Sequence, residues 1–283
     1  MIAIVDSGLL RVLPALVGAF GLAFGSFLNV VVYRVPRGLS VVNPPSACPG
    51  CSSEIAARDN IPVLSWLMLR GRCRTCREPI SARYPIVEAI TAVAFVAVGI
   101  LFLTRIAAQT TVASSIGEGV ALIAFLYLAA ISVALTAIDI DLKRLPNAIV
   151  LPAYGVGGVL LGISGLLSGD PVSLAWAAAG AGLSFAFYLL LAVVSNGGMG
   201  MGDVKLAGVL GLYLGFLGPA PLFVGIAAGF LLGGLYGVGV LLSGKGGRKT
   251  AIPFGPFMIA GAWLAVFVGQ PVADAYLSIS GLN

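Results

Sequence analysis

Residues 200–242 read GMGDVKLAGVLGLYLGFLGPAPLFVGIAAGFLLGGLYGVGVLL, in which Asp203 closes a glycine-rich break and two apolar runs follow. The apolar bias extends to the whole chain, since hydrophobic residues make up 59% of the 283 positions and charged residues only 10%. Soluble domains are about 45–50% apolar and about 25% charged. The composition therefore predicts a protein that crosses a membrane several times.

A membrane-spanning helix needs about 20 apolar residues. The fold expected is all-α, with about eight such helices at residues 8–33, 84–104, 119–138, 147–167, 172–194, 204–217, 219–242 and 252–269. The sixth span is short. Gly218-Pro219 separates it from the seventh, so one kinked segment is the alternative.

Eight spans place alternate loops on opposite sides, and the side rich in Lys and Arg is the cytoplasmic one. With the N-terminus outside, every Lys and Arg except Arg11 and Arg105 lies inside, including Lys245, Arg248 and Lys249. The net charge of +5 is then a topology signal beside anionic lipid, and nucleic-acid binding is not expected.

The four cysteines all lie in the large loop at residues 34–83, as the pairs Cys48/Cys51 and Cys73/Cys76. Two Cys-x-x-Cys pairs near this spacing are typical of a zinc site with four thiolate ligands. Disulfides are the alternative, but the predicted cytoplasmic location is reducing. Four protein ligands leave no open position on the metal, so we expect the Zn²⁺ to be structural.

Two aspartates lie at the ends of apolar runs, and the predicted topology places both at the same depth in the membrane. Asp139 ends the third span as it reaches the cytoplasm, and Asp203 begins the sixth as it leaves. Carboxylates at membrane depth are costly and are candidate functional groups. Two that share a site do not both ionise readily, so one can accept a proton from water while the other polarises a carbonyl. The pair predicts acid–base peptide hydrolysis, and the absence of histidine excludes histidine-dependent proteases.

Each aspartate also has a plain structural interpretation. Asp139 could pair with Lys143 or Arg144 at a helix end, and Asp203 could be the N-cap of the sixth span. Asp141 competes for the first role but should point elsewhere, or lie in the loop. A transporter that uses intramembrane carboxylates is the alternative function, although transport sites lie near the membrane midplane.

Two further polar residues have open roles. Glu88 lies four residues into the second span, where it could pair with Arg83 or a loop arginine, or orient a substrate. Asn29 lies near the inner end of the first span and could join two helices or bind a ligand.

Taken in order, these motifs resemble the bacterial type IV prepilin leader peptidases over nearly the full chain. The matching pieces are Gly25-Ser26-Phe27-Leu28-Asn29 through Pro36, the two Cys-x-x-Cys pairs, Arg83-Tyr84-Pro85 with Glu88, Asp139 before Pro146, Gly200 to Leu206, and Pro253 to Phe257. The Gly-x-Gly-Asp motif is shared more distantly with presenilin-type intramembrane proteases.

The resemblance implies an enzyme of the bacterial cytoplasmic membrane that removes basic leader peptides from type IV prepilins or type II secretion pseudopilins. Cleavage takes place on the cytoplasmic side, and the family's catalytic aspartates correspond to Asp139 and Asp203. Members with the cysteine-bearing region often also methylate the new N-terminus with S-adenosylmethionine. This chain has that region, although no glycine-rich nucleotide fingerprint is visible.

The substrate is expected to enter as a membrane helix that unwinds at the cleaved bond. Gly200, Gly202, Pro253 and Gly255 are the candidates for holding the unwound stretch, with Gly202 in a loop whose backbone could need φ > 0. Two regions are expected: residues 1–105, with two spans and the zinc loop, and residues 106–283, the peptidase core. The partners expected are the prepilin or pseudopilin and membrane lipid.

Overall fold

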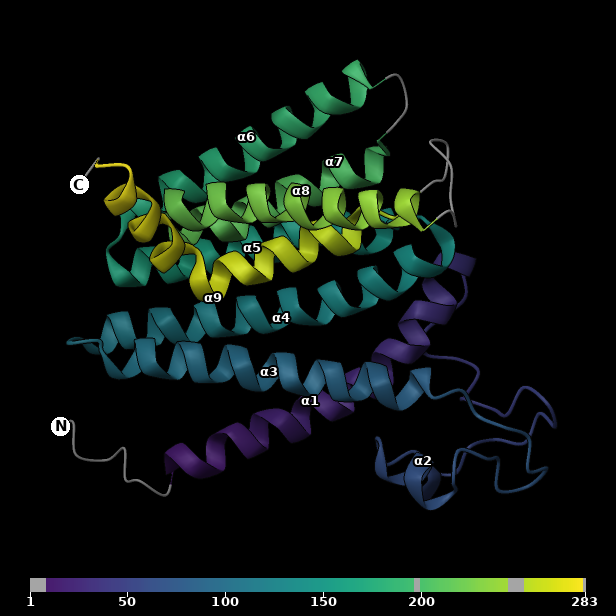
Figure 1. Ribbon diagram of the computed structural model, residues 1–283. Helices are drawn as coiled ribbons and strands as arrows, with labels where there is room; N and C mark the ends of the chain where they lie inside the picture. Colours follow the sequence, from purple (N-terminus) through teal and green to yellow (C-terminus); the bar gives the residue numbers. More distant parts are fainter. Residues whose placement is uncertain (1–8, 196–198, 244–251, 282–283) are drawn as a thin grey trace. The chain divides into compact units, whose positions relative to one another are not determined.

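Figure 1 shows the computed structural model, which describes residues 9–195, 199–243 and 252–281. Lys245, Arg248 and Lys249, which the topology prediction used, lie outside these residues. The described chain is helical apart from its connections and the large loop. Its elements are α1 (Leu9–Arg34), η1 (Val35–Arg37), η2 (Ala57–Asp59), α2 (Leu64–Met68), α3 (Arg83–Ala107), α4 (Val112–Leu142), α5 (Asn147–Ser168), α6 (Pro171–Val194), α7 (Met201–Leu217), α8 (Pro219–Leu242) and α9 (Gly255–Ile279).

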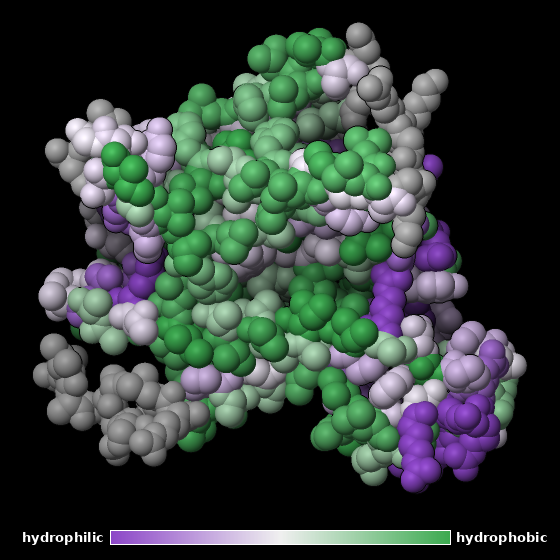
Figure 2. Space-filling view, viewed as in Figure 1, coloured by the Kyte–Doolittle hydropathy of each residue, from purple (hydrophilic) through white to green (hydrophobic). Residues whose placement is uncertain are grey.

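The prediction of an all-α polytopic membrane protein is confirmed. Over the described ranges, seven helices are long and apolar enough to cross a membrane, namely α1, α3, α4, α5, α6, α8 and α9. Hydrophobic residues dominate the surface over the long helices, as Figure 2 shows, and hydrophilic residues gather at their ends and around the loop. In the same part of the chain the only β-type pairing consists of isolated bridges in the loop.

Helix α7 (Met201–Leu217) has nearly the bounds of the predicted sixth span, but it is short and mostly surrounded by other helices. It has 17 residues, which is about 26 Å of helix and less than the hydrocarbon core of about 30 Å. Most of it is buried, because it packs against α5, α6, α8 and α9. Gly218, with φ 119°, separates α7 from α8, so the two are distinct helices.

The described residues form two compact units. The first runs to Arg105 and adds the middle of α4, Phe125–Ala134. In it, α1 packs on α3 at Gly25, where a methyl group would lie 2.6 Å from the Cα of Glu88. Only a residue without a side chain allows this approach.

The second unit holds both ends of α4 together with α5 to α9. Here α6 and α7 touch backbone to backbone, since a methyl group on Gly180 would overlap the carbonyl oxygen of Gly211. Helices α8 and α9 meet similarly at Gly229 and Gly261. Because lipid is as apolar as the side chains, close packing of small residues replaces the hydrophobic effect between such helices.

This packing predicts that substitutions at two glycines of α6 will affect the stability of the protein differently. Gly180→Ala should lower the thermal midpoint in detergent by several degrees, because overpacking costs roughly 1–3 kcal/mol. Gly182→Ala is the matched control on α6, since an added methyl group there meets open space. Equal midpoints for the two variants would show that the α6–α7 contact is not close-packed in solution.

Candidate functional site

Asp139 lies in the last turn of α4 and is 4% exposed. Its Oδ2 accepts a hydrogen bond of 3.1 Å from the backbone N–H of Gly255, the first residue of α9. The first N–H groups of a helix have no partner within the helix. Asp139 therefore caps α9 from a distant part of the chain, whereas the structural alternative considered from the sequence was an ion pair with Lys143 or Arg144.

Helix α4 ends three residues after Asp139, at Leu142. Lys143 adopts the left-handed conformation, with φ 52°, and its N–H donates to the carbonyl oxygen of Asp139 at 2.9 Å. Asp141 is exposed whereas Asp139 is buried, so the two carboxylates face different surroundings, as the sequence predicted.

Asp203 is the third residue of α7, and the N-cap position belongs to Gly200. The interpretation of Asp203 as the N-cap is therefore wrong by three residues, although its Oδ2 does accept the Gly200 N–H, at 3.3 Å. A carboxylate in the first turn also interacts favourably with the positive end of the helix dipole.

Asp139 and Asp203 belong to the same compact unit, on the last turn of α4 and the first turn of α7. Leu145 lies beside both of the elements that carry them. A methyl group on Gly202 would lie 3.0 Å from the Cβ of Leu145, and one on Gly255 would lie 3.4 Å from its Cδ2. The structure thus gathers the end of α4, the start of α7 and the start of α9 around one leucine.

Of the predicted substrate-holding residues, Gly202 and Gly255 lie beside Leu145, and the prediction for Gly202 needs one correction. Gly202 belongs to the first turn of α7, not to a loop, and it is not among the glycines with positive φ. Its need for glycine comes from the closeness of Leu145. Gly255 is similarly confined, because a methyl group there would lie 2.8 Å from the Oδ2 of Asp139. Gly200 is exposed, and Pro253 is half-buried in the non-helical residues before α9.

Sequence reasoning missed two residues of the site. Leu145 carried no signal beyond its place before Pro146. Tyr188 on α6 is 2% exposed, and its ring lies 6.4 Å from that of Phe254, the residue before α9. A tyrosine inside an apolar helix was the available signal, because a buried phenol usually has a polar neighbour.

A small cavity opens next to Tyr188, between α6, α7, α8 and α9. Its volume of about 20 Å³ suffices for roughly one water molecule. Ser184, Tyr188 and Met258 are among the lining residues, and the Ser184 hydroxyl has no hydrogen-bond partner. The cavity thus offers polar groups to a water within the same unit as the aspartates.

Lys205 fixes the first turns of α7 against α5. Its Nζ donates to the Oδ1 of Asn147 at 3.0 Å, and its carbonyl oxygen accepts from the hydroxyl of Tyr154 at 2.7 Å. These bonds hold the helix that carries Asp203 in a fixed position along α5.

The four cysteines form one cluster in the first unit. Their sulfur atoms all lie within 4.8 Å of one another, and the Sγ atoms of Cys48 and Cys76 are 3.7 Å apart. A tetrahedral site with Zn–S bonds of about 2.3 Å requires sulfur atoms about 3.8 Å apart. The cysteines are free thiols, not disulfides, and the cluster could hold a metal ion.

The two halves of the cluster are built alike. Cys48 and Cys73 each accept, at the carbonyl oxygen, a backbone hydrogen bond from the residue four positions later. Those later residues, Ser52 and Arg77, both have positive φ. Backbone N–H groups of Cys76 and Thr75 lower the pKa of Cys73 to about 6, which favours the thiolate that binds metal.

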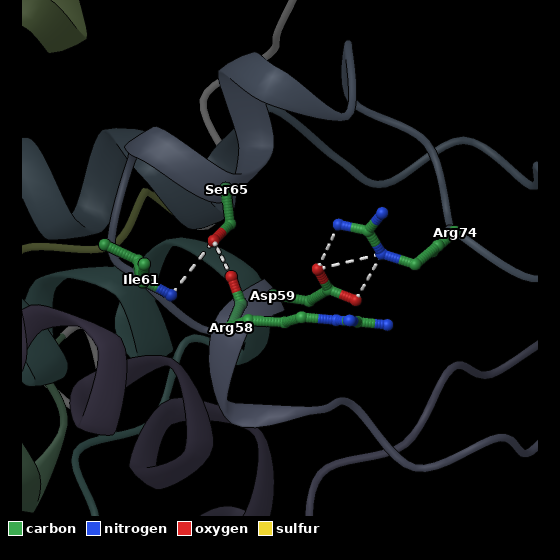
Figure 3. A network of polar contacts seen from close by, with 5 residues as sticks. All are labelled: Arg58, Asp59, Ile61, Ser65 and Arg74. Atoms are coloured by element: carbon green, nitrogen blue, oxygen red, sulfur yellow. Dashed lines mark hydrogen bonds and ion pairs between the residues drawn. The ribbon is translucent and has the colours of Figure 1, made fainter.

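Figure 3 shows the polar contacts that stiffen the loop beside the cluster. Arg74, between two cysteines, donates to both carboxylate oxygens of Asp59 in η2 and thereby lowers the pKa of that carboxyl. The buried hydroxyl of Ser65 in α2 accepts from the N–H of Ile61 and donates to the carbonyl oxygen of Arg58.

Glu88 and Asn29 join the loop and the helices of the first unit. Glu88 is 7% exposed, accepts the Val63 N–H at 2.7 Å and hydrogen-bonds Ser26. Asn29 donates to the carbonyl oxygen of Tyr84 at 3.2 Å, which links α1 to α3. The helix-joining interpretation of Asn29 is the one the structure supports.

Fold and site together define a multi-pass membrane protein with one carboxylate at the end of α4, another at the start of α7, and a cluster of four cysteines. Comparison with known proteins identifies the group within this class. Residues 19–102 match the bacterial peptidase A24 N-terminal domain, and residues 125–238 match the type IV leader peptidase family. The chain belongs to that family, as its motifs indicated.

The chain is similar to proteins named prepilin leader peptidase/N-methyltransferase, among them the following three. The Aeromonas hydrophila protein is 36% identical, over 93% of each chain. The Pseudomonas putida protein is 35% identical, over 92% of each chain. The Bacillus subtilis protein is 32% identical, over 92% of this chain and 96% of its own. No solved structure matches the chain.

Proposed function

We propose that the protein cleaves the basic leader peptide from type IV prepilins or pseudopilins, with Asp139 and Asp203 as the catalytic pair. The observation that carries the proposal is the gathering of the end of α4, which carries Asp139, the start of α7, which carries Asp203, and the start of α9 around Leu145. The names and high coverage of the relatives support the choice of substrate.

The chemistry follows from two carboxylates that differ in surroundings. Because like charges close together resist joint ionisation, the pair shares a proton. The ionised member takes a proton from water, whose oxygen attacks the peptide carbonyl carbon, while the protonated member donates to the carbonyl oxygen. The proton taken from water then passes to the leaving nitrogen as the C–N bond breaks. Asp139 is buried and held by Gly255, and Asp203 is only half-buried.

Both carboxylates lie near helix ends, which supports cleavage at a membrane face over transport through the midplane. With the N-terminus outside, that face and the cysteine loop are cytoplasmic. Residues 1–105 then form the metal-binding N-terminal region and residues 106–283 the peptidase core. Gly200, Gly202, Pro253 and Gly255 border the place where an unwound substrate would lie.

The N-methyltransferase part of the relatives' name supports a second activity at the new N-terminus. S-adenosylmethionine is the donor that such a transfer would use. Zn²⁺ is the metal that best fits the cysteine cluster, since the spacing of the sulfur atoms suits tetrahedral thiolate coordination. With four protein ligands it would shape the loop and take no part in peptide hydrolysis.

Asp139→Asn and Asp203→Asn should each abolish prepilin cleavage in membranes. An amide can neither accept the proton from water nor hold and donate the proton that the two carboxylates share. Asp141→Asn is the matched control and should keep most of the activity, since its side chain is exposed. Cleavage near the wild-type rate by either of the first two variants, at equal expression, would refute the assignment.

The purified protein should contain about one zinc per chain. Replacing Cys48 and Cys51 by serine should remove the metal, as measured by elemental mass spectrometry, whereas Pro49→Ala between them should retain it. A metal-free wild-type protein with its thiols paired as disulfides would refute both zinc binding by the cysteines and the cytoplasmic location of their loop.

Gly202→Val should lower the cleavage rate by about tenfold or more, because displacement of reacting groups by even 1 Å is costly. The added side chain would push Leu145, which also borders Gly255 and therefore Asp139. Gly162→Val on α5 is the control, because its added side chain begins in open space. Zinc content and membrane insertion should be unchanged in both. A wild-type rate for Gly202→Val would show that Leu145 does not position the pair.

A further inference from the structure

The short helix α2 presents apolar side chains outward and its polar side chain inward. Leu64, Leu67 and Met68 lie on one face and are 57%, 57% and 80% exposed. Ser65 points into the loop domain and is 6% exposed. Its hydroxyl accepts a hydrogen bond from the Ile61 N–H and donates one to the Arg58 carbonyl oxygen (Figure 3). This arrangement is the reverse of a helix that faces water.

The placement of α2 along the membrane-spanning helices of its own unit is fixed by polar contacts. Val63, immediately before α2, donates its N–H to the carboxylate of Glu88 in α3. Val63 has φ 62°, a conformation that β-branched residues rarely adopt. Glu88 lies about 8 Å along α3 from Arg83, at 1.5 Å per residue. The start of α2 therefore lies beside the first turns of a membrane-spanning helix.

The surroundings of α2 match a membrane interface in both polarity and charge. On α3, Ile86 and Ile90 are 53% and 52% exposed, so apolar surface continues past the level of Glu88. Exposed arginines lie on either side of α2 in the sequence, at Arg58, Arg70 and Arg72. Figure 2 shows hydrophobic and hydrophilic residues on different sides of the region around α2. Interfacial helices bury their apolar face about 5–10 Å deep, with basic residues at the phosphates.

We propose that α2, together with the exposed Ile61, inserts its apolar face into the lipid at the boundary of headgroups and acyl chains. The cysteine-cluster domain is thereby held flat against the membrane, with Glu88 setting its depth and the flanking arginines binding anionic phosphates. The partner is lipid, because only the bilayer supplies apolar surface at this level along α3 together with negative charge next to it.

The test is photo-crosslinking of the full-length protein in nanodiscs of phosphatidylcholine and phosphatidylglycerol. The photoreactive residue p-benzoylphenylalanine replaces Met68 in one variant and Glu54, an exposed polar position of the same domain, in the control. After irradiation, mass spectrometry should find phospholipid attached to the Met68 variant and not to the Glu54 variant. Zinc content and prepilin cleavage in the unirradiated samples show that both variants are folded.

Other occupants of this face would give different products. A crosslink to another segment of the chain, to a second copy, or to added prepilin in place of lipid would overturn the proposal, as would the absence of any adduct at Met68. A second measurement does not depend on the photoreactive group. Leu67→Asn/Met68→Asn should increase tryptic cleavage after Arg70 several-fold in nanodiscs while zinc stays bound, and unchanged cleavage would also count against lipid insertion.

Discussion

The hydrogen bond from the Gly255 N–H to the Asp139 carboxylate joins the fold to the site. It satisfies two groups that would each be costly alone: a buried carboxylate and an unpaired N–H at a helix start. Hydrogen bonds to charged groups contribute about 1.5–3 kcal/mol, and leaving a buried charge without one costs more. The end of α4 and the start of α9 are therefore held together although they lie far apart in the chain.

The long helices could be predicted from the sequence because membrane lipid imposes a minimum apolar length. Their ends could not, since local capping decides them. Helix α4 begins at Val112, well before the predicted residue 119, because the Thr111 hydroxyl accepts the Ser114 N–H. The cysteine cluster was predictable because metal ligands require definite spacing, and the structure brings all four sulfur atoms together.

The residues that the sequence did not predict act through contacts between distant segments. Leu145 gives no pattern of its own, yet it lies beside Gly202 and Gly255. Gly202 was expected in a loop that could need positive φ, and it lies instead in the first turn of α7, where Leu145 leaves little room for a side chain. Helix α2 was missed because five residues are too few for periodicity, and because its apolar residues point outward.

The cysteine cluster and the carboxylates belong to different compact units, which is consistent with the chemistry proposed for each. A four-thiolate metal has no free coordination position for water, so it can stiffen a loop but cannot replace an acid–base pair. The carboxylates in turn need helix ends, where unpaired N–H groups and irregular backbone meet. Residues 252–254 lead without helical structure into α9, and the first N–H of that helix is already bonded to Asp139. The irregular segment therefore ends at the residue that Asp139 binds, and this bond ties the start of α9 to the end of α4.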